Sequence, residues 1–441
     1  MKAVILAAGE GKRMRPLTFT RPKPLLRVAN KPILHHTLEQ IKKVGIDEVI
    51  VVVGYMWEQI KNYFGEEFQG IKINYVLQKE QLGTGHALLQ AKDLLRNEEK
   101  FLVLYGDDIY SSGDMEKCIR HDMCVSAKKV EDPERFGVFI LEGNKVLDLI
   151  EKPSQFVSDI ANTGMYVFDK EIFNFIQSEK SIRGEIELTD YVKRISSVFD
   201  VDCEIVENWI PIGYPWDLLT ANEEKLKDIK SFISDGAKIE SNVSMDKEVF
   251  INSNVRIRSG VYIEGPCFIG EGSDIGPNCY IRSNTTIGKN CRIGNGSEIK
   301  NVIVDDNTHI SHLSYVADSL IGKNCNFGAG TIVANLRHDN KPIKVLIKGE
   351  LKDTRRRKFG IVMGDYCKTG IGTMFYPGMI LGPFSWTSPN STVNKNLEPF
   401  RLFDGEKKLI EKDKIESAIK EEKDKEFFMM LFDKLREIDY G

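Results

Sequence analysis

The chain has 441 residues, of which 41% are hydrophobic and 29% are charged, proportions that are ordinary for a folded globular protein. Its length is long for a single hydrophobic core and predicts two or three domains. The formal net charge of −4 offers no basic field to nucleic acid, and no apolar run is long enough to span a bilayer, so neither nucleic acid nor a membrane is an expected partner.

The first apolar run, Val4 to Leu6, is short and is soon followed by Gly9, Gly11 and Arg13. A secretory signal peptide needs a longer apolar stretch. The run therefore predicts a buried first β-strand, and the expected location of the protein is the cytoplasm.

Residues 1–228 consist of short apolar runs separated by helical stretches. This alternation predicts an α/β domain whose Rossmann-like, mostly parallel sheet is covered by helices on both faces, with ligands at the carboxyl ends of the strands. The expected strands are residues 4–6, 49–53, 73–76 and 101–105, and the expected helices include residues 35–44 and 85–95.

A repeat of six residues replaces this pattern over residues 235–400. Aliphatic side chains recur with this step, and a small side chain stands two residues before each aliphatic of the second run. Such hexapeptide repeats predict a left-handed parallel β-helix with a stacked aliphatic interior. The two runs are Val243, Val249, Val255 and Val261 and, after a slip of two residues, Ile269, Ile275, Ile281, Ile287, Ile293 and Ile299.

The eight cysteines include no C-x-x-C pair, so a zinc site is not expected. Four of them hold the small-residue position of the repeat, which predicts a packing role and free thiols rather than a redox or metal role. These four are Cys267, Cys279, Cys291 and Cys325.

Two charged segments lie in the C-terminal part of the chain. Residues 341–358 are strongly basic, and they suit either a solvated hairpin that protrudes from the coil or a rim that meets an anionic ligand. Residues 401–441 carry apolar side chains at helical spacing and predict a helical tail. Whether this tail caps the coil or binds a neighbouring subunit is left open by the sequence.

A glycine-rich loop follows the first expected strand. Gly9 and Gly11 let backbone N–H groups approach a polyphosphate closely, and Arg13 and Lys23 add positive charge. A G-x-G pattern alone is weak, but here it is joined by R-x-x-P-L-T and P-K-P-L. Together these motifs predict a phosphate-binding site.

Residues 1–228 resemble the sugar-1-phosphate nucleotidylyltransferases. The resemblance rests on several motifs that occur in the order found in that family. Besides the loop, they are Gln78 with residues 82–87, Tyr105 to Asp108, Phe136 to Val138, Glu151 to Pro153, Asn162 to Gly164 and Gly184 to Asp190.

The resemblance implies a role for each matching residue. Arg13 and Lys23 would hold the triphosphate and the transferring phosphoryl group, and Asp107 would bind Mg²⁺. The nucleotide would be UTP or dTTP, lined by Leu6, Ala8 and Gly9, with its base read by Gln78, Gly83 and Thr84. The sugar-1-phosphate would be held by Gly137, Glu151 and Asn162 at its hydroxyls and by Lys152 at its phosphate.

The family's second metal-binding aspartate has no direct counterpart. Pro211 stands at the expected place, and Asp217 is the nearest carboxylate. Asp217 is either the replacement ligand or the cap of the following helix. The chemistry itself needs no general base, because a sugar phosphate is already a good nucleophile, and cations with Mg²⁺ neutralise the charge growing on pyrophosphate.

The C-terminal repeat resembles the acetyltransferase domain of bifunctional enzymes that acetylate glucosamine-1-phosphate. His312 to Tyr315 interrupts the repeat, and His312 would be the general base that takes the proton from the attacking amine. Substrate binding would involve Arg282, Lys300, Tyr315, Asn326, Asn335 and Lys341, with Ala329 at acetyl-CoA, which is a co-substrate. The resemblance also implies a homotrimer.

Three functions are therefore considered. The first is a bifunctional enzyme that acetylates an amino-sugar-1-phosphate and joins the product to a nucleotide. The second is a single-activity glucose-1-phosphate nucleotidylyltransferase with a regulatory or oligomerising β-helix. The third is a regulatory subunit without activity, which the presence of Arg13, Lys23 and Asp107 argues against. The expected domains are residues 1–228 for nucleotidyl transfer, 235–400 for acyl transfer and 401–441 for the tail.

Overall fold

A computed structural model describes residues 1–176, 184–419 and 422–438. The contacts divide the chain into two compact units. The first contains Met1–Glu10, Arg21–Leu26 and Pro32–Ile212, and the second contains Gly11–Thr20, Arg27–Lys31 and Gly213–Gly441. Across the described ranges, no helix has the length and apolar character needed to cross a membrane.

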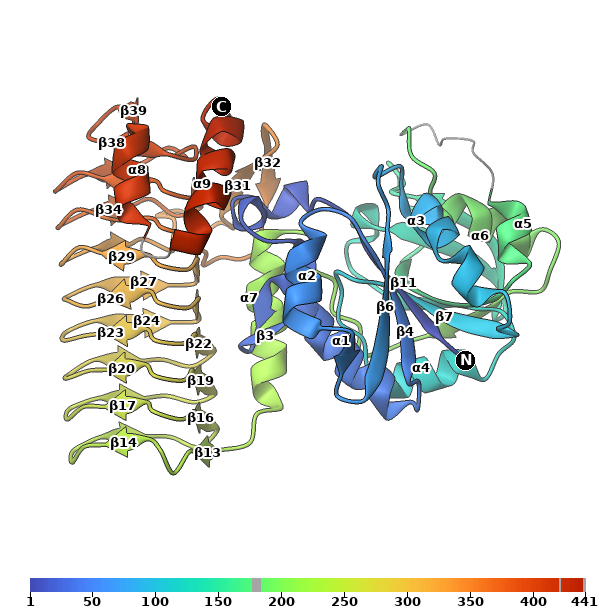
Figure 1. Ribbon diagram of the computed structural model, residues 1–441, viewed down its shortest axis with the longest axis horizontal. Coiled ribbons are helices and arrows are strands. Elements are labelled where there is room, and N and C mark those ends of the chain that lie inside the picture. Colours follow the sequence, from blue (N-terminus) through green and yellow to red (C-terminus); the bar gives the residue numbers. More distant parts are fainter. Residues whose placement is uncertain (177–183, 420–421, 439–441) are drawn as a thin grey trace. The chain divides into compact units, whose positions relative to one another are not determined.

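The first unit is built on a ten-stranded sheet (Figure 1). Its centre is parallel: β1 (Ala3–Ala7) lies between β4 (Glu48–Val53) and β7 (Lys100–Tyr105), and β6 (Ile71–Leu77) pairs with β4. All five residues of β1 are buried. The four strands expected from the sequence are confirmed, and the first apolar run is a central strand.

The rest of this sheet is largely antiparallel. β11 (Ile160–Asp169) runs antiparallel to β7, and the short β5 (Glu67–Phe68) pairs with β6 at the opposite edge. Beyond β11 the order is β8 (Cys124–Lys129), β12 (Asp202–Ile205), β10 (Lys145–Glu151) and β9 (Gly137–Glu142).

Helices cover both faces of the sheet, as the alternating pattern predicts. Ala3, Ile5 and Ala7 share a core with α1 (Ile33–Lys43), α2 (Trp57–Phe64) and α4 (Ser112–Ile119). Val4 and Leu6 share the other core with α3 (Thr84–Gln90), α5 (Ile172–Phe175) and α6 (Leu188–Ser196). The helix expected over residues 85–95 is shorter, because α3 ends at Gln90 and a 3-10 turn, Lys92–Leu95, follows.

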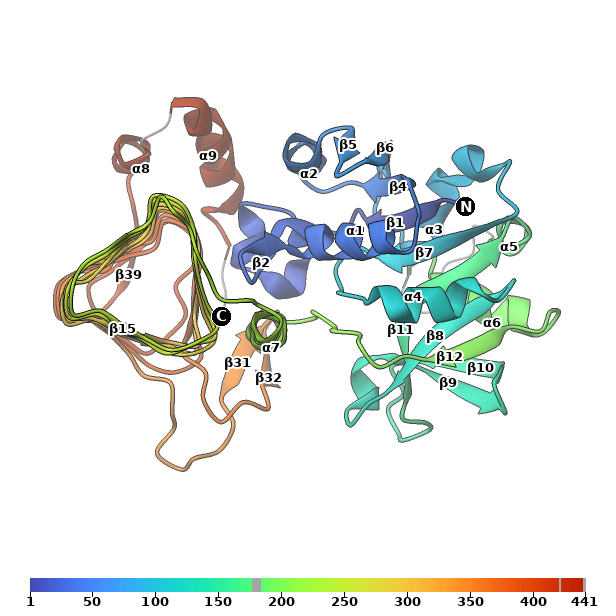
Figure 2. The ribbon, with the colours of Figure 1, turned by 90° about the horizontal axis from the view of Figure 1, so that it is seen from below.

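The second unit is a coil of three parallel sheets whose cross-section is triangular (Figure 2). The first coil sheet contains β13 (Phe232–Ile233), β16 (Val249–Ile251), β19 (Cys267–Ile269), β22 (Thr285–Ile287), β25 (Ile303–Val304), β28 (Leu320–Ile321), β33 (Ile361–Met363) and β35 (Met379–Leu381). The second contains β14 (Lys238–Ile239), β17 (Arg256–Ile257), β20 (Asp274–Ile275), β23 (Arg292–Ile293), β26 (His309–Ile310) and β29 (Asn326–Phe327). The third contains β15 (Ser244–Met245), β18 (Tyr262–Ile263), β21 (Tyr280–Ile281), β24 (Glu298–Lys300), β27 (Tyr315–Ala317), β30 (Ile332–Val333), β34 (Met374–Phe375) and β37 (Thr392–Val393).

The repeat runs without the two-residue slip expected from the sequence, and that expectation is wrong. Ile251 pairs with Ile269, and Val249 pairs with Cys267, each eighteen residues or three repeats apart. Two positions of every repeat therefore face the interior, and in the first coils both are aliphatic. The valines of the first run occupy the position that small residues hold later, so the change is one of side-chain size and leaves the register intact.

The tetrapeptide from His312 to Tyr315 does not interrupt the coil either. Ile310 and Val316 stand six residues apart and are both fully buried in the column. Leu313 adopts the left-handed conformation at φ 47, as asparagines do at several other corners of the coil. The backbone thus turns normally here, and only the side chains depart from the repeat. The sequence pattern suggested a break because an exposed histidine and leucine replace the usual corner residues.

The basic segment forms the hairpin that was one of the two expectations. β31 (Lys344–Ile347) and β32 (Glu350–Asp353) are antiparallel. One side of β31 is not solvated, because Val345 and Ile347 are buried. A Cβ added to Gly378 would come within 2.8 Å of Ile343, so the hairpin base packs on the coil closely enough to require glycine.

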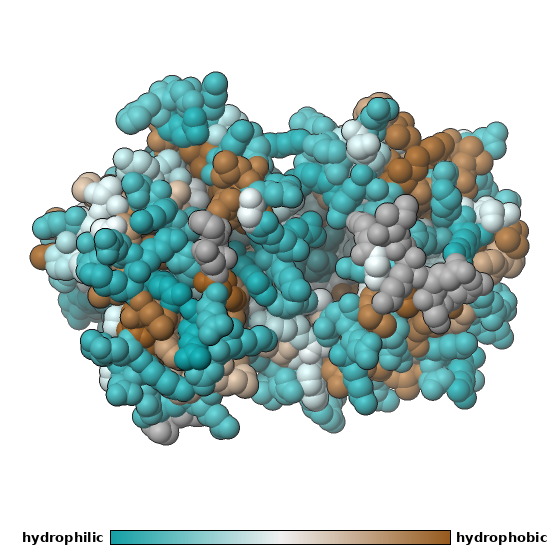
Figure 3. Space-filling model, turned by 90° about the horizontal axis from the view of Figure 1, so that it is seen from above, coloured by the Kyte–Doolittle hydropathy of each residue, from teal (hydrophilic) through white to brown (hydrophobic). Residues whose placement is uncertain are grey.

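The tail starts with strands and then becomes helical. β36 (Trp386–Thr387) pairs with β38 (Arg401–Phe403), and β38 pairs with β39 (Lys407–Leu409). The helix expected to begin at 401 begins later, because Phe403 is drawn into the coil interior. α8 (Lys412–Ala418) and α9 (Glu422–Leu435) follow, and their apolar residues pack on the coil of the same chain. This end of the coil presents a mostly hydrophilic surface with scattered apolar side chains (Figure 3).

The eight cysteines are all free and all buried. Burial raises the pKa of the Cys267 thiol to about 12, so the reactive thiolate is scarce at neutral pH. We expect the native protein to resist alkylation by iodoacetamide and the unfolded protein to take up eight equivalents. Mass spectrometry before and after denaturation measures this. Rapid labelling of any thiol in the folded protein contradicts the packing role.

Candidate active sites

The carboxyl ends of four parallel strands meet at one edge of the first unit's sheet. Leu6 pairs with Tyr105, Ala7 with Val53, and Val53 with Leu77. The residues that follow these strands therefore lie along the same edge, where open α/β sheets bind ligands. Among the sequence-predicted residues, the edge brings together Ala8, Gly9, Gln78 and Asp107, with Leu6 at the strand end. A Cβ added to Gly9 would meet no atom within 4 Å, so its backbone is open to a ligand.

The expected base-reading residues are fixed in a sharp turn before α3. The Gln78 side chain is buried, and its Nε2 donates to the carbonyl of Gly83 at 3.1 Å. Gly83 has φ 118, and an added Cβ would lie 2.4 Å from the carbonyl oxygen of Ile186, so only glycine fits. The hydroxyl of Thr84 accepts a hydrogen bond from the backbone N–H of Leu188 at 2.9 Å.

Lys23 and Asp107 form a close ion pair with 2.5 Å between Nζ and Oδ2. The lysine is buried, whereas 40% of the aspartate side chain is exposed. Asp107 thus presents carboxylate oxygen to solvent, which is the donor chemistry that Mg²⁺ takes together with water. The exposed carboxylate of Asp107 suits a metal cation, and the ammonium group of Lys23 beside it suits a triphosphate.

Asp108 is a residue that sequence reasoning missed, although it belongs to the quoted Tyr105–Asp108 motif. Its carboxylate accepts hydrogen bonds from the indole N–H of Trp209 at 3.0 Å and from the backbone N–H of Ile212 at 2.9 Å. Burial and the charge of Asp107 raise the pKa of Asp108 to about 7. Asp108 therefore anchors the stretch around Pro211 beside the site. The sequence signal that could have identified Asp108 is its position directly after Asp107.

The expected sugar-binding residues lie on the antiparallel strands. Gly137 and Glu151 are paired across β9 and β10, and a Cβ on Gly137 would come within 2.7 Å of the Glu151 carboxylate. Lys152 has φ 47 and its Nζ lies 3.9 Å from Glu151. Asn162 is buried on β11, and its Nδ2 donates to the hydroxyl of Tyr166 at 2.7 Å.

Arg13 and Asp217 belong to the second unit. The Arg13 guanidinium carbon lies 5.5 Å from the ring centroid of Tyr214, a cation–π contact, and the residue is exposed. Asp217 lies in the first turn of α7 (Pro215–Lys227), where its Oδ2 accepts from the backbone N–H groups of Gly213 and Tyr214, both at 2.8 Å. Asp217 therefore caps this helix.

Part of the expected acetyltransferase set gathers on the third coil sheet. Glu298 pairs with Tyr315, and Arg282 donates to the Glu298 carboxylate at 3.0 Å. Lys300 ends β24 on the same sheet. Burial raises the pKa of Tyr315, and a hydrogen bond with Asn335 partly opposes that rise.

The other expected residues lie elsewhere on the coil. His312 is exposed at the corner between β26 and β27, and its carbonyl accepts from the N–H of Gly330, the neighbour of Ala329. Asn326 pairs with His309 on the second coil sheet. Lys341 is exposed in the segment before the hairpin. In a single chain, the expected acetyltransferase residues are therefore divided between the second and third sheets of the coil.

A buried polar network extends from Asn335 to α7. Asp318 accepts from Asn335 at 2.6 Å and from Asn301 at 2.9 Å. Asn301 also donates to Glu223 on α7 at 3.0 Å. Sequence reasoning did not find Asp318, because a buried aspartate at a coil corner has no motif of its own.

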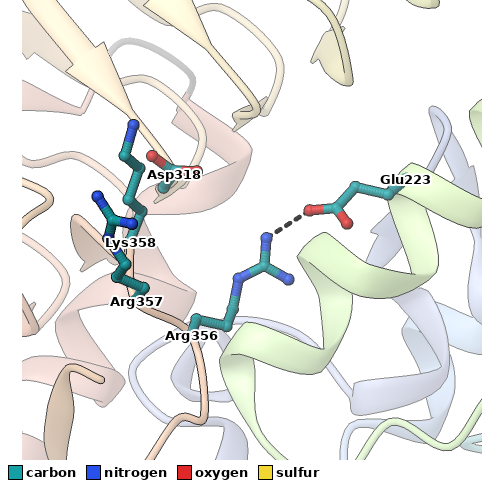
Figure 4. A pocket seen from close by; sticks show the side chains of 5 residues that line it. All are labelled: Glu223, Asp318, Arg356, Arg357 and Lys358. Carbon is teal, nitrogen blue, oxygen red and sulfur yellow. Dashed lines mark hydrogen bonds and ion pairs between the residues drawn. The ribbon is translucent and has the colours of Figure 1, made fainter. Parts of the chain in front are cut away.

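A hollow of about 470 Å³ lies beside this network. Arg356 reaches Glu223 from the hairpin base and also donates to Thr220 at 3.0 Å. In Figure 4, Arg356 points to α7, whereas Arg357 and Lys358 lie on the side of Asp318. Arg357 and Lys358 therefore bring positive charge next to the polar network of Asn335 and Asp318. The lining residues are Glu223, Asp318, Arg356, Arg357 and Lys358.

Two family models match the chain. The nucleotidyl transferase model matches residues 2–228, and the model of the GMPPB C-terminal domain matches residues 263–395. The first covers about half of the chain and the whole ten-stranded sheet. The second lies entirely within the coil.

Archaeal proteins are similar along most of the chain. "Bifunctional protein GlmU" of Methanococcus maripaludis is 44% identical over 404 residues, which cover 90% of this chain and 96% of the relative. The protein of the same name from Methanocaldococcus jannaschii is 42% identical with the same coverage. The "bifunctional sugar-1-phosphate nucleotidylyltransferase/acetyltransferase" of Sulfurisphaera tokodaii is 37% identical and is covered to 98%. The chain therefore belongs to the family of bifunctional sugar-1-phosphate nucleotidylyltransferase/acetyltransferases.

Proposed function

We propose that this chain is a cytoplasmic enzyme with two activities. It acetylates glucosamine-1-phosphate or galactosamine-1-phosphate with acetyl-CoA, and it transfers UMP or dTMP from UTP or dTTP to a sugar-1-phosphate with release of pyrophosphate. The observation that carries the proposal is the identity of 44% to a bifunctional relative across both units. UDP-N-acetylglucosamine is the product we favour.

In nucleotidyl transfer, an oxygen of the sugar phosphate attacks the α-phosphorus of the nucleotide, and the bond to pyrophosphate breaks. Lys23 and Arg13 supply positive charge to the triphosphate, and the open backbone at Gly9 supplies N–H donors. Leu6 and Ala8 line the nucleotide. Gln78, Gly83 and Thr84 recognise the pyrimidine.

Asp107 would hold Mg²⁺, because its exposed carboxylate offers the hard oxygen that this ion prefers. When bound there, Mg²⁺ would supply positive charge to the leaving pyrophosphate. As the second ligand, Asp217 would exchange its capping hydrogen bonds from Gly213 and Tyr214 for the ion. The sugar is bound by Gly137, Glu151 and Asn162 through its hydroxyls and by Lys152 through its phosphate.

In acetyl transfer, the sugar amine attacks the thioester carbonyl, a C–N bond forms, and CoA leaves as the thiol. His312 accepts the proton that the amine loses and is exposed where a substrate can reach it. Arg282 and Lys300 bind the sugar phosphate, and Tyr315, Asn326, Asn335 and Lys341 orient the substrates. Ala329 lines acetyl-CoA.

We further propose a homotrimer of left-handed coils. The distribution of the acetyltransferase residues over two faces supports this assembly, because a neighbouring subunit would complete a site that one chain leaves divided. Residues 1–228 carry the nucleotidyl transfer motifs, residues 235–400 carry the acetyl transfer residues, and residues 401–441 form a supporting tail.

A substrate matrix tests the proposed function. UTP and dTTP are each combined with glucose-, N-acetylglucosamine- and glucosamine-1-phosphate, with and without acetyl-CoA, and pyrophosphate and free thiol are measured. We expect thiol release with an amino-sugar-1-phosphate and pyrophosphate release with its acetylated product. Pyrophosphate without any thiol indicates a single-activity nucleotidylyltransferase. Release of neither product from any combination indicates a regulatory subunit.

A further inference from the structure

The part of the glycine-rich loop from Gly11 onward belongs to the coil by its contacts. Gly11–Thr20 groups with the second unit, although in sequence it lies between β1 and β2 (Arg27–Val28) of the N-terminal part. This loop carries Arg13, which the proposed function assigns to the triphosphate. The residues that fix the loop are therefore of interest for nucleotidyl transfer.

Thr20 ties the end of the loop to a turn of the coil. Its hydroxyl donates to the Oδ2 of Asp365 at 2.7 Å, and both residues are buried, with exposed fractions of 7% and 4%. The Oδ1 of Asp365 accepts from the backbone N–H of Lys323 at 2.8 Å, which holds the carboxylate in place. A hydrogen bond to a buried, oriented carboxylate is among the stronger neutral-to-charged contacts in proteins.

Phe19 joins the aromatic cluster that the C-terminal tail covers. It is buried in the same hydrophobic cluster as a stack in which the ring of Tyr366 lies 4.7 Å from Phe384, and Phe384 lies 5.2 Å from Phe400. The tail contributes Phe428, whose ring lies 4.7 Å from Tyr366. The tail and the loop thus share one small core on the coil.

The loop is also closed on itself. The carbonyl of Gly11 accepts from the Thr18 hydroxyl at 2.9 Å and from the backbone N–H of Met14 at 2.8 Å. Gly11 has φ 64, a left-handed conformation that suits glycine. A closed loop behaves as one piece, so the attachment at Thr20 constrains Arg13 as well.

We propose that Thr20, Asp365 and Phe19 are positioning residues for nucleotidyl transfer. The coil and its tail hold the glycine-rich loop in the conformation that presents Arg13 to the triphosphate. The coil thereby serves the activity of the N-terminal motifs in addition to its own. This inference rests on the proposed nucleotidyl transfer.

The full-length chain with Thr20→Val tests the proposal, because valine keeps the shape and removes the hydroxyl. We expect the KM for the nucleoside triphosphate to rise about tenfold, a change that corresponds to the loss of one such contact. Amide hydrogen exchange of residues 11–20 should become faster, and thiol release from acetyl-CoA should stay unchanged. Thr20→Ser retains the hydroxyl and should behave close to wild type.

Thr308→Val is the matched control. Thr308 is fully buried in the coil, and its hydroxyl donates to Gly322 at 2.8 Å and accepts from Cys325 at 3.0 Å. The Thr308→Val variant should have a lower melting temperature than the wild type and an unchanged KM for the nucleoside triphosphate. An equal KM rise in both variants, or unchanged loop exchange in Thr20→Val, overturns the proposal. An inactive wild type contradicts the proposed nucleotidyl transfer, whereas an active wild type with an unchanged KM in Thr20→Val overturns the anchor alone.

Discussion

Replacing His312 by alanine is expected to reduce the release of thiol from acetyl-CoA by roughly a hundredfold to ten-thousandfold, the usual contribution of a general base. The imidazole is exposed at a corner of the coil and is not part of the buried column, so its loss should leave the fold intact. Pyrophosphate release should remain at the wild-type rate. Both assays are run on one preparation of the variant.

His338→Ala is the matched control, since His338 is also exposed and lies 26 residues farther along the chain. It should leave thiol release unchanged. Persistence of both activities in His312→Ala makes the coil a scaffold and favours the single-activity enzyme. Loss of both activities with a lowered melting temperature indicates a folding defect rather than a missing base.

Replacing Arg13 by alanine should lower nucleotidyl transfer by a hundredfold or more, which corresponds to about 3 kcal/mol of lost transition-state stabilisation. Arg13 is exposed, and its guanidinium rests over the ring of Tyr214. The variant therefore removes charge from the loop with little effect on packing. Steady-state pyrophosphate release at saturating Mg²⁺ measures the effect.

Two variants sharpen this test. Lys12→Ala removes an adjacent exposed cation and should have a much smaller effect if position matters more than local charge. Arg13→Lys keeps the charge but loses the planar fork that matches phosphate, so intermediate activity is expected. Near-wild-type turnover in Arg13→Ala would contradict the assigned role, and thiol release serves as the internal reference.

The parallel centre of the sheet was predictable because its signals are local, whereas the antiparallel strands beyond β7 depart from the expected mostly parallel sheet. Short apolar runs such as residues 49–53 are bounded by helical stretches, and the parallel order follows from that alternation. Five of the motif residues could likewise be placed at strand ends that share one edge, namely Leu6, Ala8, Gly9, Gln78 and Asp107. The coil was predicted from its period alone.

The repeat's register was misjudged because periodicity was read from side-chain size. Val249 and Cys267 occupy equivalent interior positions, yet only the first is aliphatic. The position of the glycine-rich loop was not predictable at all. The hydrogen bond from Thr20 to Asp365 joins residues that are 345 positions apart in the sequence. No sequence motif contains both of them.

The two ends of the coil are finished differently. At the C-terminal end, β38 turns back on β39 in an antiparallel hairpin, and the helices α8 and α9 cover apolar side chains nearby. At the other end, β13, β14 and β15 are the terminal strands of their sheets. There, Phe232 and Ile233 are each nearly half exposed.

This asymmetry has a consequence for self-association. A parallel coil with two bare ends could add copies head to tail and grow as an open fibre, since terminal strands are templates for pairing. At the C-terminal end, the hairpin of β38 and β39 blocks this pairing in the sheet that begins with β14. End-to-end association through that sheet must then join two first coils, which is a two-fold arrangement that closes after one step and cannot propagate.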